Sequence, residues 1–193
     1  MTCIVGLVHK NGVTLAADSI ATGGTLTEEN RTPKLALLET TQVCDNHTLT
    51  PINIGIGYTS SYRMGDLLKY NFNPPKLEKD QDANEYLVKS FVPELIECFD
   101  KHHFTKTHSG VKEGGEFLVA IKKRLFIVQG DFSILEPSSG FSSVGSGSYV
   151  ALGALYSAKK NKVAADLAVV QAVEAASAYT TSVGGKITTL AVQ

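Results

Sequence analysis

The sequence lacks several features that mark special classes of protein. It has no tryptophan and only three cysteines, which stand far apart at Cys3, Cys44 and Cys98. This odd, scattered set forms neither a metal-binding spacing nor a disulfide framework, which is typical of a protein in a reducing cytoplasm. No apolar run approaches the ~18 residues of a membrane span, and the N-terminus lacks the basic region and cleavage site of a secretory signal. We therefore expect a cytoplasmic protein that has no metal, no cofactor and no membrane partner.

The chain also lacks an excess of charge of either sign. It has 18 Lys and Arg residues against 19 Asp and Glu residues, a formal net charge of -1. The densest basic cluster, residues 122–124, is better interpreted as a charged β-turn than as a nucleic-acid site, so we expect no nucleic-acid partner. With 193 residues, 43% of them apolar, the chain is long enough to bury a substantial core. Because no linker or internal repeat divides it, we expect one domain over residues 1–193.

Apolar periodicity predicts blocks of strands that alternate with pairs of helices. The stretch 22–32 is polar and glycine-rich, and the polar, glycine-bearing stretch 105–115 is expected to be a loop. A helix is expected over 82–103, with Asp82 as its N-cap and a kink or a break at Pro93. The order of strands, two helices, strands, two helices and strand favours stacked layers with the helices outside and two sheets packed together inside. The expected strands are 3–9, 13–18, 34–38, 49–57, 116–121, 125–129, 132–135 and 187–192, and the other expected helices begin near 58, 146 and 163.

Three motifs carry a resemblance to a known family. Residues 12–19 read Gly-Val-Thr-Leu-Ala-Ala-Asp-Ser, and residues 145–147 read Gly-Ser-Gly before an alanine-rich helix. Asp18 and Lys34 also follow Thr2 at the spacing that the family shows between its nucleophile, its aspartate and its lysine. Together these features resemble proteasome β-subunits and the bacterial HslV peptidase, with this chain as a bacterial or phage homologue.

The resemblance implies an α+β fold and a peptidase activity. The fold would be the four-layer αββα sandwich of N-terminal-nucleophile (Ntn) hydrolases, in which helix pairs flank two packed antiparallel sheets. The activity would be hydrolysis of peptide bonds by Thr2 after removal of Met1. A threonine hydroxyl needs a base beside it, and the freed α-amine, with an ordinary pKa of about 7.7–8.0, would supply one.

The resemblance also implies a role for each site residue. Lys34 would lower the pKa of the Thr2 hydroxyl, Asp18 would orient Lys34, and Ser146 would help to move protons near the α-amine. A backbone N–H would form the oxyanion hole, with Gly57 as the candidate. The backbone of Ala21 and Thr22 would bind an extended peptide as an added strand.

Family members assemble, and the resemblance therefore implies partners. We expect a homo-oligomer of stacked rings with six or seven copies each, which encloses the active sites. Polypeptides would be the substrates, and an ATP-dependent unfoldase or a cap would deliver them. Small, uncharged side chains at Ala21, Thr32 and Ala36 predict a preference for neutral side chains beside the cleaved bond.

Two departures from the family keep other functions open. The late aspartate and serine of proteasome β-subunits are replaced by Thr180 and Val183, and Ser182 stands one residue away from the place of the serine. One alternative is an inactive ring component in which Asp18 and Lys34 form only a structural ion pair. Another is an Ntn amidohydrolase that acts on a small amide. Retention of Met1 would favour the inactive protein, and an open monomer or dimer would favour the amidohydrolase.

Overall fold

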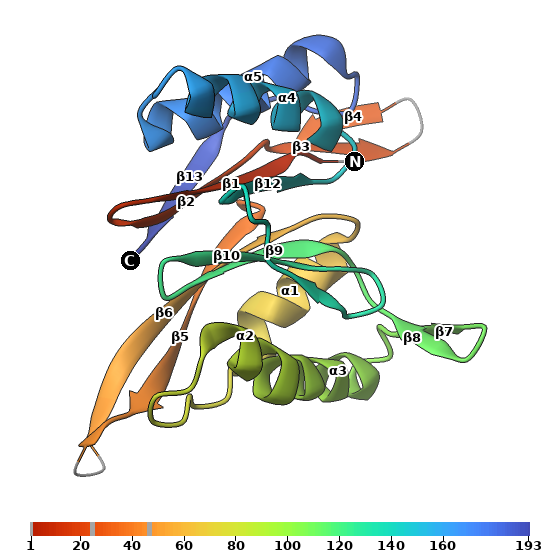
Figure 1. The fold of residues 1–193 in the computed structure, drawn as a ribbon. Helices are drawn as coiled ribbons and strands as arrows, with labels where there is room; N and C mark the ends of the chain where they lie inside the picture. The colour runs from red at the N-terminus through yellow and green to blue at the C-terminus, as the bar shows by residue number, and fades with distance from the viewer. Residues whose placement is uncertain (1, 24–25, 46–47) are drawn as a thin grey trace.

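Two antiparallel sheets, of four and five strands, form the centre of the protein (Figure 1). The computed structural model describes residues 2–23, 26–45 and 48–193. The four-stranded sheet has the order β12-β1-β2-β13, and the five-stranded sheet has the order β11-β10-β9-β6-β5. The strands of the first sheet are β1 (Ile4–His9), β2 (Gly12–Ala17), β12 (Phe141–Val144) and β13 (Thr188–Val192). Those of the second are β5 (Leu35–Val43), β6 (Leu49–Tyr58), β9 (Phe117–Ile121), β10 (Arg124–Val128) and β11 (Ile134–Leu135).

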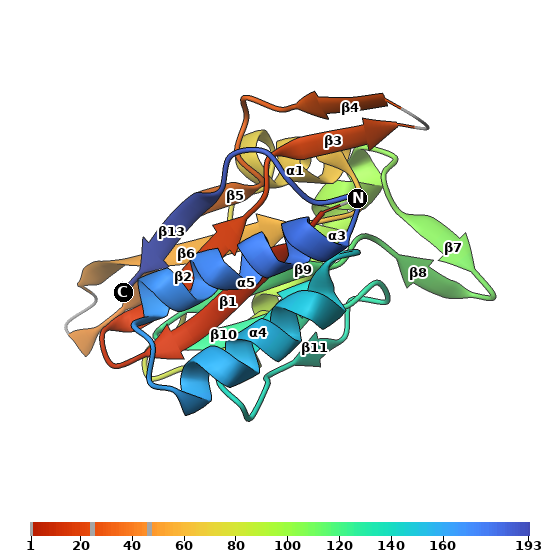
Figure 2. The same ribbon diagram turned by 90° about the horizontal axis from the view of Figure 1, so that it is seen from above.

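Helices cover the outer face of each sheet. Helices α4 and α5 lie along the four-stranded sheet, whereas α1, α2 and α3 lie against the five-stranded sheet (Figures 1 and 2). The expected combination of helices with packed antiparallel sheets is confirmed. No helix in the described part of the chain is long and apolar enough to cross a bilayer. The helices are α1 (Tyr62–Tyr70), α2 (Ala83–Tyr86), α3 (Val92–Lys101), α4 (Ser148–Lys160) and α5 (Ala165–Tyr179).

Strand β1 is apolar along most of its length because both of its faces are covered. Side chains alternate between the two faces of a strand. Ile4 therefore packs in the core between the sheets, whereas Val5 packs in the core beneath α4 and α5. Both side chains are fully buried. This two-sided burial holds the start of β1 rigidly, and with it the residue that precedes the strand, Thr2.

Glycines let the two sheets approach closely. A Cβ atom on Gly57 of β6 would lie 2.4 Å from Cγ2 of Ile4, and one on Gly55 would lie 2.4 Å from Cγ2 of Val192. Cβ atoms do not approach other heavy atoms this closely without a shift of the structure. The contact between the sheets therefore depends on hydrogen in place of a side chain at these two positions.

The longest expected helix contains a change of helical type. Asp82 caps it as expected, since its carboxylate accepts the N–H groups of Asn84 and Glu85. The expected interruption at Pro93 takes the form of a π-helical segment, η2 (Leu87–Phe91), between α2 and α3. Proline has no N–H to donate, and its ring clashes with the carbonyl four residues earlier. A wider π turn immediately before Pro93 accommodates both effects without a break in the helix.

The loop expected over 105–115 is wrong, because this segment contains a β-hairpin, and the polar stretch 22–32 contributes to another hairpin. Strands β3 (Ile20–Gly23) and β4 (Leu26–Glu29) pair antiparallel, as do β7 (Lys106–His108) and β8 (Val111–Glu113). Sequence reasoning also missed β12, which pairs with β1. Strands β4, β7 and β8 are exposed throughout. An apolar alternation marks a strand only when one face is buried, so these hairpins leave no such signal.

We predict that Gly57→Ala destabilises the fold. The added methyl group would overpack the contact with Ile4 and lower the free energy of unfolding by about 1–3 kcal/mol. Gly153→Ala is the matched control, because Gly153 is exposed in α4 and a Cβ atom there meets open space. It should leave stability unchanged or raise it by about 0.5–1 kcal/mol. Urea unfolding of both variants measures the difference, and equal stabilities would contradict the tight contact between the sheets.

Candidate active site

Thr2 lies immediately before β1, where the turn after β12 passes over it. Its backbone nitrogen donates to Oγ of Ser146 at 3.2 Å, and its carbonyl accepts the N–H of Gly147 at 3.3 Å. Gly145 has a φ of +96°, and a Cβ atom there would lie 2.3 Å from the Thr2 carbonyl oxygen. Only glycine tolerates both conditions. The Gly-Ser-Gly motif is therefore the turn that brings Ser146 to the nitrogen of Thr2.

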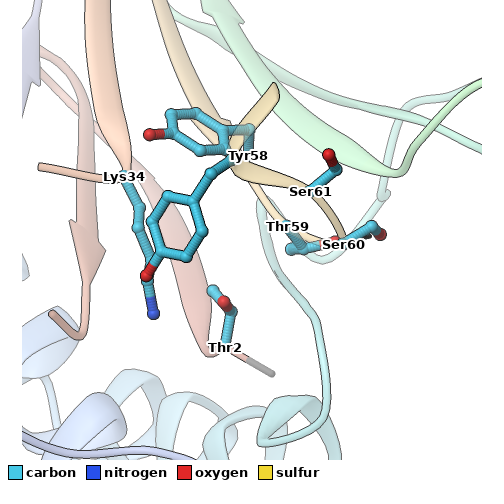
Figure 3. Close-up of a pocket in the computed structure, with 7 residues that line it drawn as sticks. Thr2, Lys34, Tyr58, Thr59, Ser60 and Ser61 are labelled. Carbon is cyan, nitrogen blue, oxygen red and sulfur yellow. Dashed lines mark hydrogen bonds between the residues drawn. The ribbon is translucent and has the colours of Figure 1, made fainter. Parts of the chain in front are cut away.

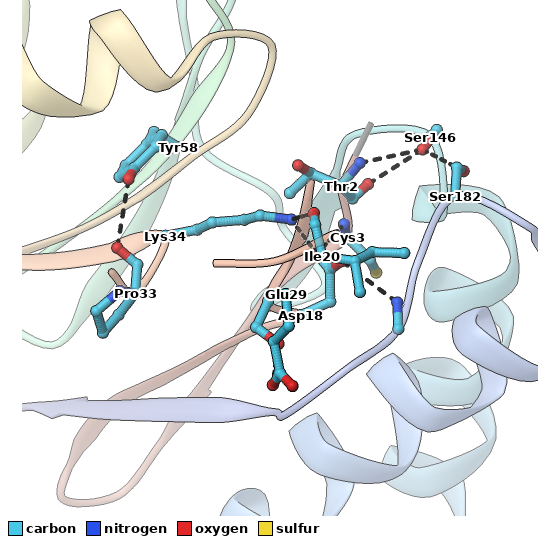
Figure 4. A network of polar contacts seen from close by, with 12 residues as sticks. Thr2, Cys3, Asp18, Ile20, Glu29, Pro33, Lys34, Tyr58, Ser146 and Ser182 are labelled. Carbon is cyan, nitrogen blue, oxygen red and sulfur yellow. Dashed lines mark hydrogen bonds and ion pairs between the residues drawn. The ribbon is translucent and has the colours of Figure 1, made fainter. Parts of the chain in front are cut away.

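A buried ion pair lies beside Thr2. Nζ of Lys34 donates to Oδ1 of Asp18 at 2.9 Å and to the carbonyl oxygen of Ile20 at 2.7 Å. The Lys34 side chain is 2% exposed and that of Asp18 is fully buried. Figures 3 and 4 show the amino end of the Lys34 side chain extending toward Thr2. The structure thus brings together the four predicted catalytic residues, Thr2, Asp18, Lys34 and Ser146.

Asp18 accepts two backbone N–H groups in addition to Lys34. The N–H of Cys3 donates to Oδ1 at 2.9 Å, and the N–H of Gly184 donates to Oδ2 at 3.3 Å (Figure 4). Hydrogen bonds to a charged acceptor are stronger than those between neutral groups. Asp18 therefore ties the start of β1, the end of β2 and the loop before β13 to the lysine.

Burial shifts the pKa values of two groups near Thr2. It lowers the pKa of Lys34 below the ordinary lysine value of 10.5, although the charge of Asp18 acts in the opposite direction. Burial also raises the pKa of the Cys3 thiol to about 11. Cys3 is therefore a buried, protonated thiol at neutral pH.

A small pocket opens beside Thr2 and Lys34. Its volume is about 30 Å³, which is enough for one or two water molecules. Apart from Lys34, every residue that lines it carries a hydroxyl group. The pocket is lined by Thr2, Lys34, Tyr58, Thr59, Ser60, Ser61 and Tyr62 (Figure 3).

Known structures share this fold over nearly the whole chain. BPH from Thiobacillus denitrificans superimposes with a TM-score of 0.71 at 17% identity, covering 100% of this chain and 99% of that one. The chain has the fold of the proteasome-like and HslV-like proteins. HslV from Trypanosoma brucei gives a TM-score of 0.62 at 15% identity, with 98% of each chain covered. Anbu, the ancestral β-subunit, from Yersinia bercovieri gives 0.64 at 13% identity, over 99% of this chain and 81% of that one.

Comparisons of sequence give no such match. No protein-family model and no curated protein matches the chain. At identities of 13–17% the structural likeness establishes the proteasome-like fold, and the chemistry has to be argued from the residues of this chain.

Three other predicted residues do not line the pocket. Gly57 is paired on both sides within its sheet, with Leu35 of β5 and Leu118 of β9. Its role as an oxyanion donor stays a prediction, whereas its close packing against Ile4 is a structural reason for glycine there. Ala21 and Thr22 lie in β3 and pair with β4, and their role in peptide binding also stays a prediction.

Ser182 joins the site in a way that the sequence only hinted at. Its Oγ lies 2.9 Å from Oγ of Ser146, so that Ser182, Ser146 and the nitrogen of Thr2 form a continuous polar chain (Figure 4). Thr180 instead donates to the carbonyl of Ala176 at the end of α5, and Val183 is buried in the core beneath α4 and α5. Ser182 therefore supports Ser146 in this proteasome-like site.

Reasoning from the sequence missed the contribution of residues 58–62. Thr59 donates to the carbonyl of Glu116 at 3.0 Å, and its hydroxyl lies 2.9 Å from that of Ser60. Ser60 has a φ of +69°, a left-handed conformation that is uncommon outside glycine. The five consecutive hydroxyl-bearing residues that follow Gly57 were the available signal, although such a run is also typical of a solvated loop.

We predict that breaking the buried ion pair destabilises the fold strongly. Asp18→Leu or Lys34→Met leaves one charge buried without its partner, which should lower the free energy of unfolding by about 3–5 kcal/mol. The double variant should lose less than the sum of the two single variants. Urea unfolding provides all three values.

The exposed pair of Glu85 and Lys89, separated by 2.7 Å, is the control. Lys89→Ala should cost about 0.3–0.5 kcal/mol, because solvent screens that pair. Losses of similar size at both pairs would show that the pair of Asp18 and Lys34 contributes no more than a surface contact.

Proposed function

We propose that this protein is a threonine peptidase that hydrolyses peptide bonds with Thr2 as its N-terminal nucleophile. The observation that carries the proposal is the position of Thr2 between two sets of polar groups. The buried pair of Lys34 and Asp18 lies near its side chain, and Ser146 lies 3.2 Å from its nitrogen. A buried ion pair is costly to maintain, and an N-terminal threonine needs a cation and a proton carrier at these two places.

The reaction begins once Met1 is removed. Met1 lies outside the described residues, and the nitrogen of Thr2 becomes an α-amine only after that removal. The neutral α-amine takes the proton of the Thr2 hydroxyl as Oγ1 attacks the carbonyl carbon of the scissile bond. The ammonium of Lys34 stabilises the negative charge on Oγ1 during this attack. Asp18 keeps Lys34 oriented through the 2.9 Å contact.

Collapse of the tetrahedral intermediate cleaves the peptide. The carbon–nitrogen bond breaks, the α-ammonium returns its proton to the departing amine, and an acyl ester remains on Oγ1. A water molecule then attacks the ester carbon while the α-amine takes a proton from it. The bond between the acyl carbon and Oγ1 breaks, the α-ammonium returns the proton to Oγ1, and the peptide leaves with a new carboxyl group. Ser146, with Ser182 behind it, holds the α-amine in place during both proton transfers.

The proposal also includes the architecture of the chain and its assembly into rings. The order of helix pair, sheet, sheet and helices supports the four-layer αββα sandwich of Ntn hydrolases. Stacked rings of six or seven copies in the cytoplasm, fed by an unfoldase or a cap, would enclose the sites. Large side chains that are exposed in α4 and α5 would supply apolar surface for contacts with another copy. These are Tyr149, Tyr156, Leu167 and Tyr179.

We predict that a peptide epoxyketone labels the natively expressed protein once per chain. The epoxyketone closes a ring on one residue only when a hydroxyl and a free α-amine are both present. Intact mass should show loss of Met1 and one adduct. Thr2→Ala should show none, because the hydroxyl is absent, whereas Thr2→Ser should still be labelled.

Two other results would end the peptidase proposal. A retained Met1 without an adduct would leave an inactive protein with the proteasome-like fold. An adduct that persists in Thr2→Ala would place the reaction at another residue. The similarity to BPH in complex with epoxomicin (TM-score 0.72, 16% identity) supports this choice of probe.

We predict a bell-shaped pH dependence of kcat/KM. Activity should rise as the α-amine loses its proton, near its ordinary pKa of about 7.7–8.0. It should fall again at a pH below 10.5, because burial lowers the pKa of Lys34 and its ammonium is lost early. Lys34→Arg is the control for the alkaline limb, since a guanidinium stays charged throughout this range. The residual activity of Lys34→Arg should therefore not fall at alkaline pH. If it falls at the same pH as in the wild type, the role of Lys34 is contradicted.

A further inference from the structure

Tyr62 extends from the start of α1 toward β3. Its phenol oxygen lies 3.4 Å from the carbonyl oxygen of Ile20, the same carbonyl that accepts Nζ of Lys34 at 2.7 Å. Tyr62 and Lys34, which both line the pocket, therefore meet at one carbonyl oxygen. Burial raises the pKa of the Tyr62 phenol, although the residue as a whole is 37% exposed. The tyrosine thus occupies space directly beside the lysine and the nucleophile.

The backbone of Tyr62 is held firmly in this position. Tyr58 packs flat against α1, since a Cβ atom on Gly65 would lie 2.1 Å from the Tyr58 ring. Lys69 of α1 lies over the same ring at 4.9 Å and donates to its hydroxyl at 3.2 Å. The N–H of Ser61 donates to the carbonyl of Thr59 at 2.7 Å, which closes the turn before the helix. The backbone of Tyr62 could therefore move away from Thr2 only together with α1. Without such a movement, only the side chain of Tyr62 can rotate.

Little space is left for a substrate side chain. The pocket beside Thr2 measures about 30 Å³, against roughly 300–1,000 Å³ for sites that enclose a typical small-molecule ligand. A larger hollow of about 350 Å³ lies on the far side of Pro33, but its lining includes neither Thr2 nor Lys34. The side chain that precedes a cleaved bond has to lie next to the nucleophile, so the small pocket is the one that it meets.

We propose that Tyr62 fills the subsite for the residue on the acyl side of the scissile bond, so that the enzyme cleaves after glycine, alanine or serine. The proposal rests on the peptidase function proposed above and narrows its substrate class. The hydroxyls of Thr59 and Ser60, 2.9 Å apart, give the remaining space a polar wall that suits a small side chain. Leucine and phenylalanine would need the volume that the Tyr62 ring occupies.

Fluorogenic peptides that differ only in the residue before the cleaved bond test this assignment. The wild-type enzyme should favour alanine over leucine or phenylalanine by at least about tenfold in kcat/KM, the scale on which pocket size discriminates. Tyr62→Ala should raise kcat/KM for the leucine peptide by about tenfold or more and reverse the order. Tyr62→Phe is the matched control, which keeps the ring and should therefore keep the preference for alanine.

A second measurement separates failure of this inference from failure of the peptidase proposal. Peptide epoxyketones with alanine or leucine at the same position are incubated with each variant, and intact mass reports labelling of Thr2. Labelling of the wild type by both probes at equal rates would overturn the role of Tyr62 and leave the peptidase proposal intact. The role of Tyr62 would also be overturned if the Tyr62→Ala variant is still labelled and keeps the preference of the wild type for alanine. No labelling and no cleavage in any variant would overturn both.

Discussion

The ion pair between Lys34 and Asp18 is the constraint on which the site depends. Two opposite charges are buried together, and neither can leave without exposing the other to an apolar interior. Asp18 also accepts backbone N–H groups from Cys3 and Gly184, so its position fixes segments from both ends of the chain. Thr2 is held because its neighbour in sequence, Cys3, is bonded to this carboxylate. The arrangement of groups around Thr2 thus follows from the hydrogen bonds and the ion pair that the buried carboxylate of Asp18 requires.

The packing of the sheets supplies the rigid frame for this pair. β1 and β2 are buried on both faces, and Gly55 and Gly57 allow the second sheet to lie close against them. Interiors packed to this density resist small displacements. Lys34 lies immediately before β5 of the second sheet and Asp18 immediately after β2 of the first, and the close approach of the sheets brings the two together. The same contact explains a glycine at position 57 without any chemical role.

The site differs from the pattern that the motifs led us to expect. Ser182 reaches the hydroxyl of Ser146, although the alignment of residues in the sequence placed Val183 nearest to the family's serine. Serine has no charge to offer in place of an aspartate, so the groups around Ser146 are neutral hydroxyls. The ring of Tyr62 lines the small pocket, whereas Ala21, Thr32 and Ala36, from which we predicted a preference for neutral side chains, do not line it. The proposed control of substrate choice therefore rests on a residue outside the motifs.

Local chemistry determined much that the sequence predicts correctly. Asn-Gly at residues 11–12 sets the first hairpin, Asp82 caps its helix, and the spacing of Thr2, Asp18 and Lys34 predicts the group of residues that the structure brings together. These features depend on neighbouring residues or on a fixed spacing, so they can be read along the chain. The resemblance to the family, by contrast, rests on all three motifs together and not on any one of them.

Only the tertiary structure decided what surrounds the nucleophile. The contact between Ser146 and Ser182 joins residues 36 positions apart, and that between Tyr62 and Ile20 joins residues 42 apart. Exposed hairpins such as β3–β4 carry no apolar alternation, so their strands are invisible until the chain is folded. Such contacts depend on the angle at which packed elements meet. A small change in that angle alters the distance between two hydroxyl oxygens by about 1 Å, which is enough to make or break a hydrogen bond. The sequence by itself thus determined which residues carry the motifs, and the packing of distant segments decided which of them lie together and what lies beside them.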